Sequence, residues 1–84
     1  MNAKPITLII LKDLADSGLI NELQAYHLPN GSGYYLIART RTGERILHKT
    51  RVSTLPRLFK SLDSVVDNCR TLGFKRFEVT NIKA

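Results

Sequence analysis

Few side chains of this sequence could do covalent or metal chemistry, and they do not form a known catalytic motif. The candidates are two histidines, one cysteine and two aspartates, namely His27, His48, Cys69, Asp63 and Asp67. Acid–base or nucleophilic catalysis needs a nucleophile, a base and an orienting group within reach of one another. The two aspartates are neighbours if their segment is helical, but no third metal ligand accompanies them. We therefore expect no enzyme, no cofactor and no metal site.

Binding through cations is the chemistry that the sequence favours instead. Residues 37–60 carry seven basic side chains and one acidic one, whereas the segments on either side are close to neutral. Charge that is concentrated in this way favours an anionic partner. We expect nucleic acid, DNA in the first place, with phosphate contacts from arginine and lysine and a stacking contact from tyrosine. The predicted binding residues are Tyr35, Arg39, Arg41, Arg45, Lys49 and Arg51.

The elements that must position these residues are a helix and a run of strands. Leu8, Leu11 and Leu14 repeat at helical spacing before Gly18, which predicts a helix over residues 7–17, with Pro5 close to its start. The run that begins at Ile6 is also rich in β-branched residues, so an extended start is an open alternative. Three strands follow, separated by glycine-containing turns, over residues 19–28, 34–40 and 44–52.

A second helix carries the clearest local signals of the chain. Ser61 is suited to cap its first turn, and Gly73 is suited to end it. Between them, the apolar side chains fall on one helical face, namely Leu62, Val65, Val66, Cys69 and Leu72. A short extended piece is expected at 57–59, and alternation around Phe77 and Val79 predicts a last strand.

Together these elements predict a single α+β domain over residues 1–84. We expect a small antiparallel sheet, made of a meander of three to four strands and a C-terminal strand, with two helices packed on one face. The longest apolar run is too short to span a membrane, so we expect a cytoplasmic protein. A core this small gains stability when a second copy of the chain packs against it, so we also expect a homodimer.

The register of the hairpin at residues 34–52 decides which cations share a face. A two-residue turn at Thr42-Gly43 mixes charged and apolar groups on both faces, whereas a three-residue loop over 41–43 separates them. One face then carries Tyr34, Leu36, Ala38, Ile46 and His48. The other carries Tyr35, Ile37, Arg39, Arg45, Leu47 and Lys49. We predict that the second face meets phosphates, since this would relieve the unfavourable pairing of Arg39 with Arg45.

The segment "RLFKSLDSVVDNCRTLGFKRFEV" resembles the C-terminal signature of small plasmid-encoded, ParC-type partition-associated proteins. The shared pattern is Phe59, Leu62-Asp63, Leu72-Gly73 with a hydrophobic residue after it, Phe77 and Val79. "LADSGLI" and "GYYLIAR" resemble earlier parts of that family, although this chain lacks a tryptophan after the glycine. The resemblance implies a non-enzymatic accessory protein of a plasmid or mobile element, and it supplies no site residues.

Two other readings remain open. A small sheet with exposed edges can serve as a protein-interaction module, in which the same cations receive an acidic protein. "LKDLADSGLI" followed by a hairpin also resembles the end of a winged-helix domain, but the sequence leaves no room for the helices that should precede it. Nucleic-acid binding should weaken steeply with salt, whereas a partner held by aromatic contacts should tolerate it.

Overall fold

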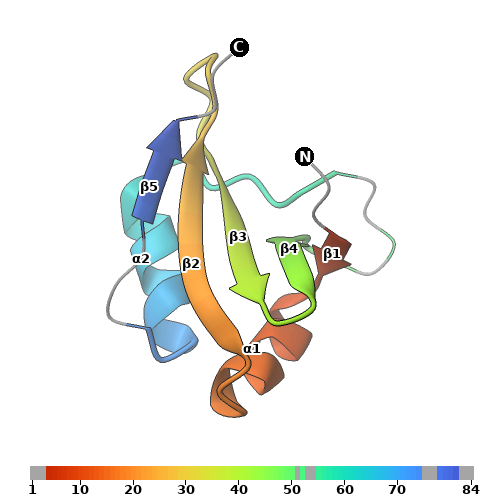
Figure 1. Ribbon diagram of the computed structural model, residues 1–84. Helices are drawn as coiled ribbons and strands as arrows, with labels where there is room; N and C mark the ends of the chain where they lie inside the picture. The colour runs from red at the N-terminus through yellow and green to blue at the C-terminus, as the bar shows by residue number, and fades with distance from the viewer. Residues whose placement is uncertain (1–3, 51, 53–54, 75–77, 82–84) are drawn as a thin grey trace.

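In the computed structural model, residues 4–50, 52, 55–74 and 78–81 are described, and they form an α+β fold (Figure 1). The elements are β1 (Lys4–Ile6), α1 (Leu8–Asp16), β2 (Ile20–His27), β3 (Tyr34–Thr40), β4 (Gly43–Leu47), α2 (Leu62–Thr71) and β5 (Glu78–Asn81). The predicted fold class is confirmed, and the bounds of both helices agree with the sequence to within one or two residues.

The sheet is mixed, which corrects the antiparallel sheet expected from the sequence. Its strand order is β1-β4-β3-β2-β5, and the meander β2-β3-β4 is antiparallel as predicted. The two edge strands are parallel to their neighbours, β1 to β4 and β5 to β2. A helical crossover leaves the strands before and after it parallel, and both edge strands are joined to the meander through a helix.

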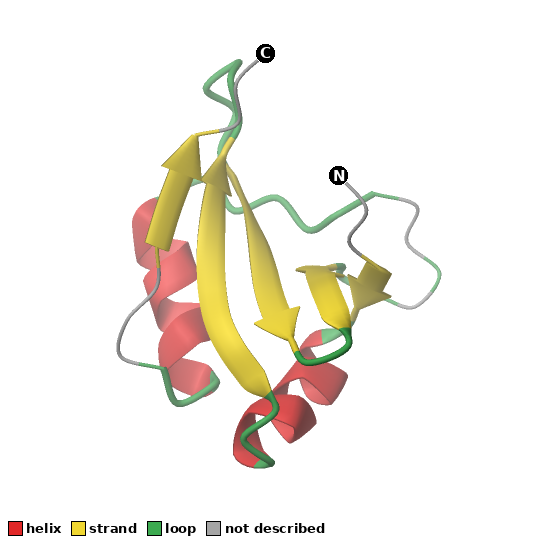
Figure 2. Cartoon of the chain, viewed as in Figure 1, coloured by secondary structure: helices red, strands yellow, loops and turns green. Residues whose placement is uncertain are grey.

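Both helices cover the same face of the sheet, and the core lies between them and the strands (Figure 2). From the helices, the core takes Leu11, Val65, Cys69 and Leu72. From the strands and the segment before α2, it takes Ile6, Ile20, Leu23, Ala25, Leu36, Ala38, Leu47 and Phe59. In this arrangement, neither of the two described helices lies over the opposite face of the sheet.

Helix α2 begins and ends as its sequence signals predict. The hydroxyl of Ser61 accepts a hydrogen bond from the backbone N–H of Ser64 at 3.3 Å. At the other end, Gly73 has φ +82°, and the N–H of Phe74 donates to the carbonyl of Cys69 at 2.8 Å. These contacts satisfy backbone groups that a helix end leaves without partners.

The start of the chain follows the extended alternative. Pro5 lies in strand β1 and not in the first turn of α1, so its expected helical position is wrong. Proline fits an edge strand because its missing N–H removes no inner hydrogen bond of the sheet. Ile6 is buried in the core, and its carbonyl accepts a hydrogen bond from the N–H of His48 at 2.9 Å.

The hairpin between β3 and β4 has a different register from the one predicted. Thr40 pairs with Gly43, Arg39 with Glu44 and Ala38 with Arg45, so the loop is Arg41-Thr42. The hydroxyl of Thr40 donates to the carbonyl of Gly43 at 2.7 Å. The loop therefore closes at Gly43, one residue before the predicted partner of Thr40, Glu44. The observed register also replaces a like-charge pair by an opposite-charge pair, which is the favourable arrangement across strands.

This slip of one residue moves the side chains of β4 to the face opposite to the one predicted. Leu36 and Ala38 lie on the core face as expected, but there they are joined by Leu47 and not by Ile46. The strand also ends at Leu47, five residues earlier than predicted. Beyond it, His48 forms an isolated bridge with Pro56, and Phe59 forms one with Tyr34, in agreement with the short extended piece predicted at 57–59.

Candidate binding surfaces

The predicted set of binding residues does not gather on one sheet face. Arg39 lies on the face without helices, whereas Arg45, opposite Ala38, belongs to the face that the helices cover. Arg41 is exposed in the hairpin loop, and Lys49 is exposed beyond the end of β4. Arg51 lies outside the described residues. The single cationic face is therefore wrong, because the register places two of its arginines on opposite sides.

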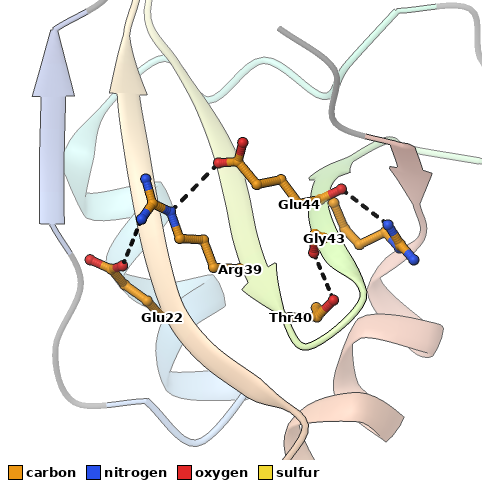
Figure 3. A network of polar contacts seen from close by, with 6 residues as sticks. Glu22, Arg39, Thr40, Gly43 and Glu44 are labelled. Atoms are coloured by element: carbon orange, nitrogen blue, oxygen red, sulfur yellow. Dashed lines mark hydrogen bonds and ion pairs between the residues drawn. The ribbon is translucent and has the colours of Figure 1, made fainter.

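Arg39 is held between two carboxylates of the same sheet (Figure 3). Its Nη1 lies 3.8 Å from Oε2 of Glu22, and its Nε lies 3.6 Å from Oε2 of Glu44. All three side chains lie about one-third to one-half exposed, so the attraction between them is weak. The group nevertheless carries one more negative than positive charge, and it offers a phosphate no net attraction.

Arg45 is bound within its own hairpin. Its Nη2 donates to Oγ1 of Thr42 at 3.0 Å, and its Nη1 donates to the carbonyl of Glu44 at 3.2 Å. The side chain is half-buried and lines a hollow of about 330 Å³ beside Ile6, Thr7 and α1. These contacts give Arg45 a structural role in closing the hairpin loop.

Tyr35, the predicted stacking residue, lies on the face without helices and is half-buried. Its direct neighbour on β2 is Tyr26. The register places four described charged side chains on this face, namely Glu22, Glu44, Glu78 and Arg39. With three carboxylates and one guanidinium, the surface around the tyrosines repels phosphates.

Three cations gather elsewhere, around an open hollow of about 870 Å³ between the end of β4 and the start of α2. Its cationic lining residues are Lys49, Arg57 and Lys60. The other described lining residues are Val52, Leu55, Pro56, Leu58, Phe59 and Ser64. We call this hollow the basic groove. No carboxylate is among the described residues that line it, and none of the three cations belongs to an ion pair among the described residues.

The groove keeps its form because the segment from residue 55 to residue 60 is fixed at two points. The N–H of Arg57 donates to the carbonyl of Leu47 at 2.8 Å. The backbones of Phe59 and Tyr34 exchange two hydrogen bonds, at 2.7 and 2.9 Å, and the ring of Phe59 is buried. Gly33 makes this approach possible, because a Cβ there would collide with the carbonyl of Phe59.

Apolar side chains in the groove are unusually exposed. Val52 is 89% exposed and Leu55 is 73% exposed, and Leu58 beside them is partly exposed. A second hollow of about 470 Å³ adjoins the groove, because both are lined by Lys49 and Val52. It leads toward α1, where Ile9 is also exposed. Contiguous exposed apolar surface of this kind is typical of interaction sites.

The residues capable of covalent chemistry have structural surroundings. Cys69 is buried in the core as predicted, and burial raises the pKa of its thiol to about 11. The ring of His27 stacks on Tyr34 with 4.7 Å between the centroids, and His48 is buried. Within the described ranges, no group of three or more potential ligands could hold a metal ion.

Comparison of the chain with family models, curated proteins and solved structures finds no significant match. The resemblance to ParC-type proteins therefore stays a prediction. Several residues of the shared pattern have clear structural roles, because Phe59 and Leu72 are buried and Gly73 ends α2. Across the described residues, no helix is long and apolar enough to cross a membrane.

Sequence reasoning missed the groove, although it noted the cations that line it. Arg57 and Lys60 belong to the basic segment 37–60, but they are not among the predicted site residues. The available signal was the stretch "LPRLFK", in which apolar and basic residues are mixed without the period of a helix or strand. Only the fold shows that Leu55 points its side chain to solvent beside them.

Proposed function

We propose that this protein is a non-enzymatic accessory protein of a plasmid or mobile element, and that it binds an acidic segment of a protein partner in the basic groove. The genetic context rests on the resemblance to ParC-type proteins. The mode of action rests on one observation, the meeting of three cations with exposed apolar side chains around a hollow that contains no described carboxylate. We place the protein in the cytoplasm and expect it to be a homodimer.

The apolar lining favours a protein over a nucleic acid as the occupant of the groove. A phosphate backbone would neutralise Lys49 and Lys60, but it has no apolar groups with which to cover Val52 and Leu55. A segment that carries both carboxylates and apolar side chains satisfies both needs at once. Interfaces between proteins combine an apolar centre with a polar rim in the same way.

Nucleic acid remains the second candidate, and the net charge of +6 favours it. Arg41 and Lys49 of the hairpin at residues 34–52 are exposed, and neither forms an ion pair within the described part of the chain. A duplex would then contact the hairpin loop and the groove side of the molecule, and not the face that carries Tyr35. Its binding would come from phosphates alone.

Two probes separate these candidates. One is a short synthetic peptide in which glutamates alternate with leucines, and the other is a DNA duplex of equal charge, each with a fluorescent label. We expect the peptide to bind at about 50 mM salt and to lose only part of its affinity at about 200 mM, because its apolar contacts resist screening. We expect the duplex to bind weakly and to lose its affinity over this range.

A control peptide with glutamine in place of glutamate should bind much more weakly than the acidic one. A duplex that binds more tightly than the acidic peptide at both salt concentrations would favour the nucleic-acid candidate. Equal binding of the acidic and the neutral peptide, or no binding of either, would reject an acidic partner in the groove.

A further inference from the structure

The face of the sheet opposite the helices is not crossed by any described helix or loop (Figure 1). We call it the bare face. Two tyrosines, Tyr26 and Tyr35, lie side by side on its central strands. The next row across the strands is Glu78, Gln24, Ile37 and Ile46, and the row after that is Glu22, Arg39 and Glu44. Its aromatic and acidic character contrasts with the basic groove.

Gln24 is the unusual residue of this face. The residue is 6% exposed, and its Oε1 has no hydrogen-bond partner within the described residues. Its neighbour on β3, Ile37, is fully buried and offers no donor. A buried carbonyl oxygen without a hydrogen-bond partner lowers the free energy of unfolding. A ligand that brings an N–H or O–H donor to this oxygen would recover that loss.

The ion pairs on the face are also incomplete. The guanidinium of Arg39 lies 3.6 Å from Glu44 and 3.8 Å from Glu22, whereas charge-assisted hydrogen bonds measure about 2.7–2.9 Å. Glu78, beside Gln24, is exposed. The carboxylates of the bare face can therefore accept further N–H donors, and the existing group shows that a guanidinium fits between two of them.

We propose that the bare face binds an arginine- or lysine-rich segment of a protein partner. The carboxylates of Glu22, Glu44 and Glu78 attract its cations, and the ring faces of Tyr26 and Tyr35 accept a guanidinium by cation–π stacking. One of its N–H groups donates to Oε1 of Gln24, after the neighbouring side chains that cover this oxygen have moved aside. A single ligand class thus satisfies the carboxylates, the tyrosines and the unpartnered acceptor.

The charge of the face distinguishes this partner from the other possible occupants. Among the described residues of this face, the phosphates of a nucleic acid would meet three carboxylates and one arginine, so these residues repel them. Two copies of the chain with their bare faces in contact would bring like charges together. The binding of a cationic segment does not depend on the basic groove. Glu44 lies near the start of β4, whereas the groove lies beyond the end of β4 and near α2.

The test is the binding of a labelled arginine-rich synthetic peptide to the purified protein and two variants. In the Glu22→Gln/Glu78→Gln variant, we expect the affinity for this peptide to fall about tenfold, because two charge-assisted contacts are lost. The acidic glutamate–leucine peptide should bind this variant as before, so a failure here is distinguishable from a failure of the groove proposal.

The second variant, Gln24→Met, separates binding from folding. Removing the unpartnered oxygen should raise the thermal midpoint, whereas the affinity for the arginine-rich peptide should fall. Unchanged affinity of both variants would overturn the proposal. Self-association of the protein that the Glu22→Gln/Glu78→Gln change abolishes would also overturn it, because the occupant would then be a second copy. Tighter binding of single-stranded DNA than of the peptide at this face would do the same.

Discussion

The Nε of Arg39 lies 3.6 Å from Oε2 of Glu44, its direct neighbour across the hairpin. A loop that ends one residue later, at Gly43, would have put Arg45 in that place. The observed register joins a cation to a carboxylate, and it turns Arg45 to the side of the sheet that the helices cover. Because of this register, Arg39 and Arg45 lie on opposite faces and do not form the cationic face that the composition suggests. Among the described residues, the groove is then the main cationic site.

Arg39 should contribute little to stability and nothing to the binding of an anionic partner. In Arg39→Met, the aliphatic part of the side chain stays, and we expect a loss of no more than about 1 kcal/mol, because the ion pairs are exposed and long. Urea unfolding measures this loss. A loss of more than about 2 kcal/mol would mean that the ion pairs are much stronger than their geometry implies.

Gly33 should be sensitive to substitution, because its φ is +143° and a Cβ there meets the backbone of Phe59. Gly33→Ala should break the hydrogen bonds between Tyr34 and Phe59, with a cost above the roughly 1–3 kcal/mol of backbone strain alone. Gly31→Ala is the matched control, since its φ is +73° but nothing lies within 4 Å of the added carbon. Equal losses in the two variants would show that the close approach of Phe59 is unimportant.

The two helix starts should differ in their response to loss of the capping residue. The hydroxyl of Ser61 accepts a hydrogen bond from Ser64, so Ser61→Ala should cost about 1 kcal/mol of stability. Thr7 precedes α1 without a capping hydrogen bond from its side chain, so Thr7→Ala should cost less. Thermal or urea unfolding of both variants gives the comparison, and a larger loss for Thr7→Ala would contradict it.

Cys69 should make stability fall at high pH. Burial raises the pKa of its thiol from 9.0 to about 11, so the unfolded chain releases this proton at a lower pH than the folded one. The contribution is constant below pH 9 and is lost as the pH rises from about 9 toward 11. We expect unfolding measurements to show a steeper decline in this range for the natural chain than for Cys69→Ala. Parallel declines would mean that the thiol is not protected by the fold.

The parts of the fold that depend on local chemistry could be predicted from the sequence. Helix α2 is the clearest case, because its cap at Ser61, its end at Gly73 and its apolar stripe are all set by neighbours in the chain. The hairpin register could not be predicted in the same way. It depends on a hydrogen bond from Thr40 to Gly43 and on a contact between Arg39 and Glu44, and the sequence shows several loops of similar plausibility.

The predicted cationic face was wrong for the same reason, because it depended on the register of the hairpin. A shift of one residue transfers every side chain of a strand to the other face, so an error that is small along the chain is complete in space. The groove depends on contacts between distant segments, such as that of Phe59 with Tyr34. The parallel edge strands were likewise hidden, because short strands such as β1 find their partners only through tertiary contacts.

The most direct test of the basic groove compares two variants that lose the same charge. Arg57→Gln/Lys60→Gln removes two cations that line the groove, and Arg39→Gln/Arg41→Gln removes two cations of the hairpin. The measurement is the affinity of each variant for the acidic glutamate–leucine peptide by fluorescence anisotropy. We predict a loss of roughly tenfold for the groove variant and little change for the hairpin variant. Equal losses, or a larger loss for the hairpin variant, would contradict the proposal that the groove is the binding site.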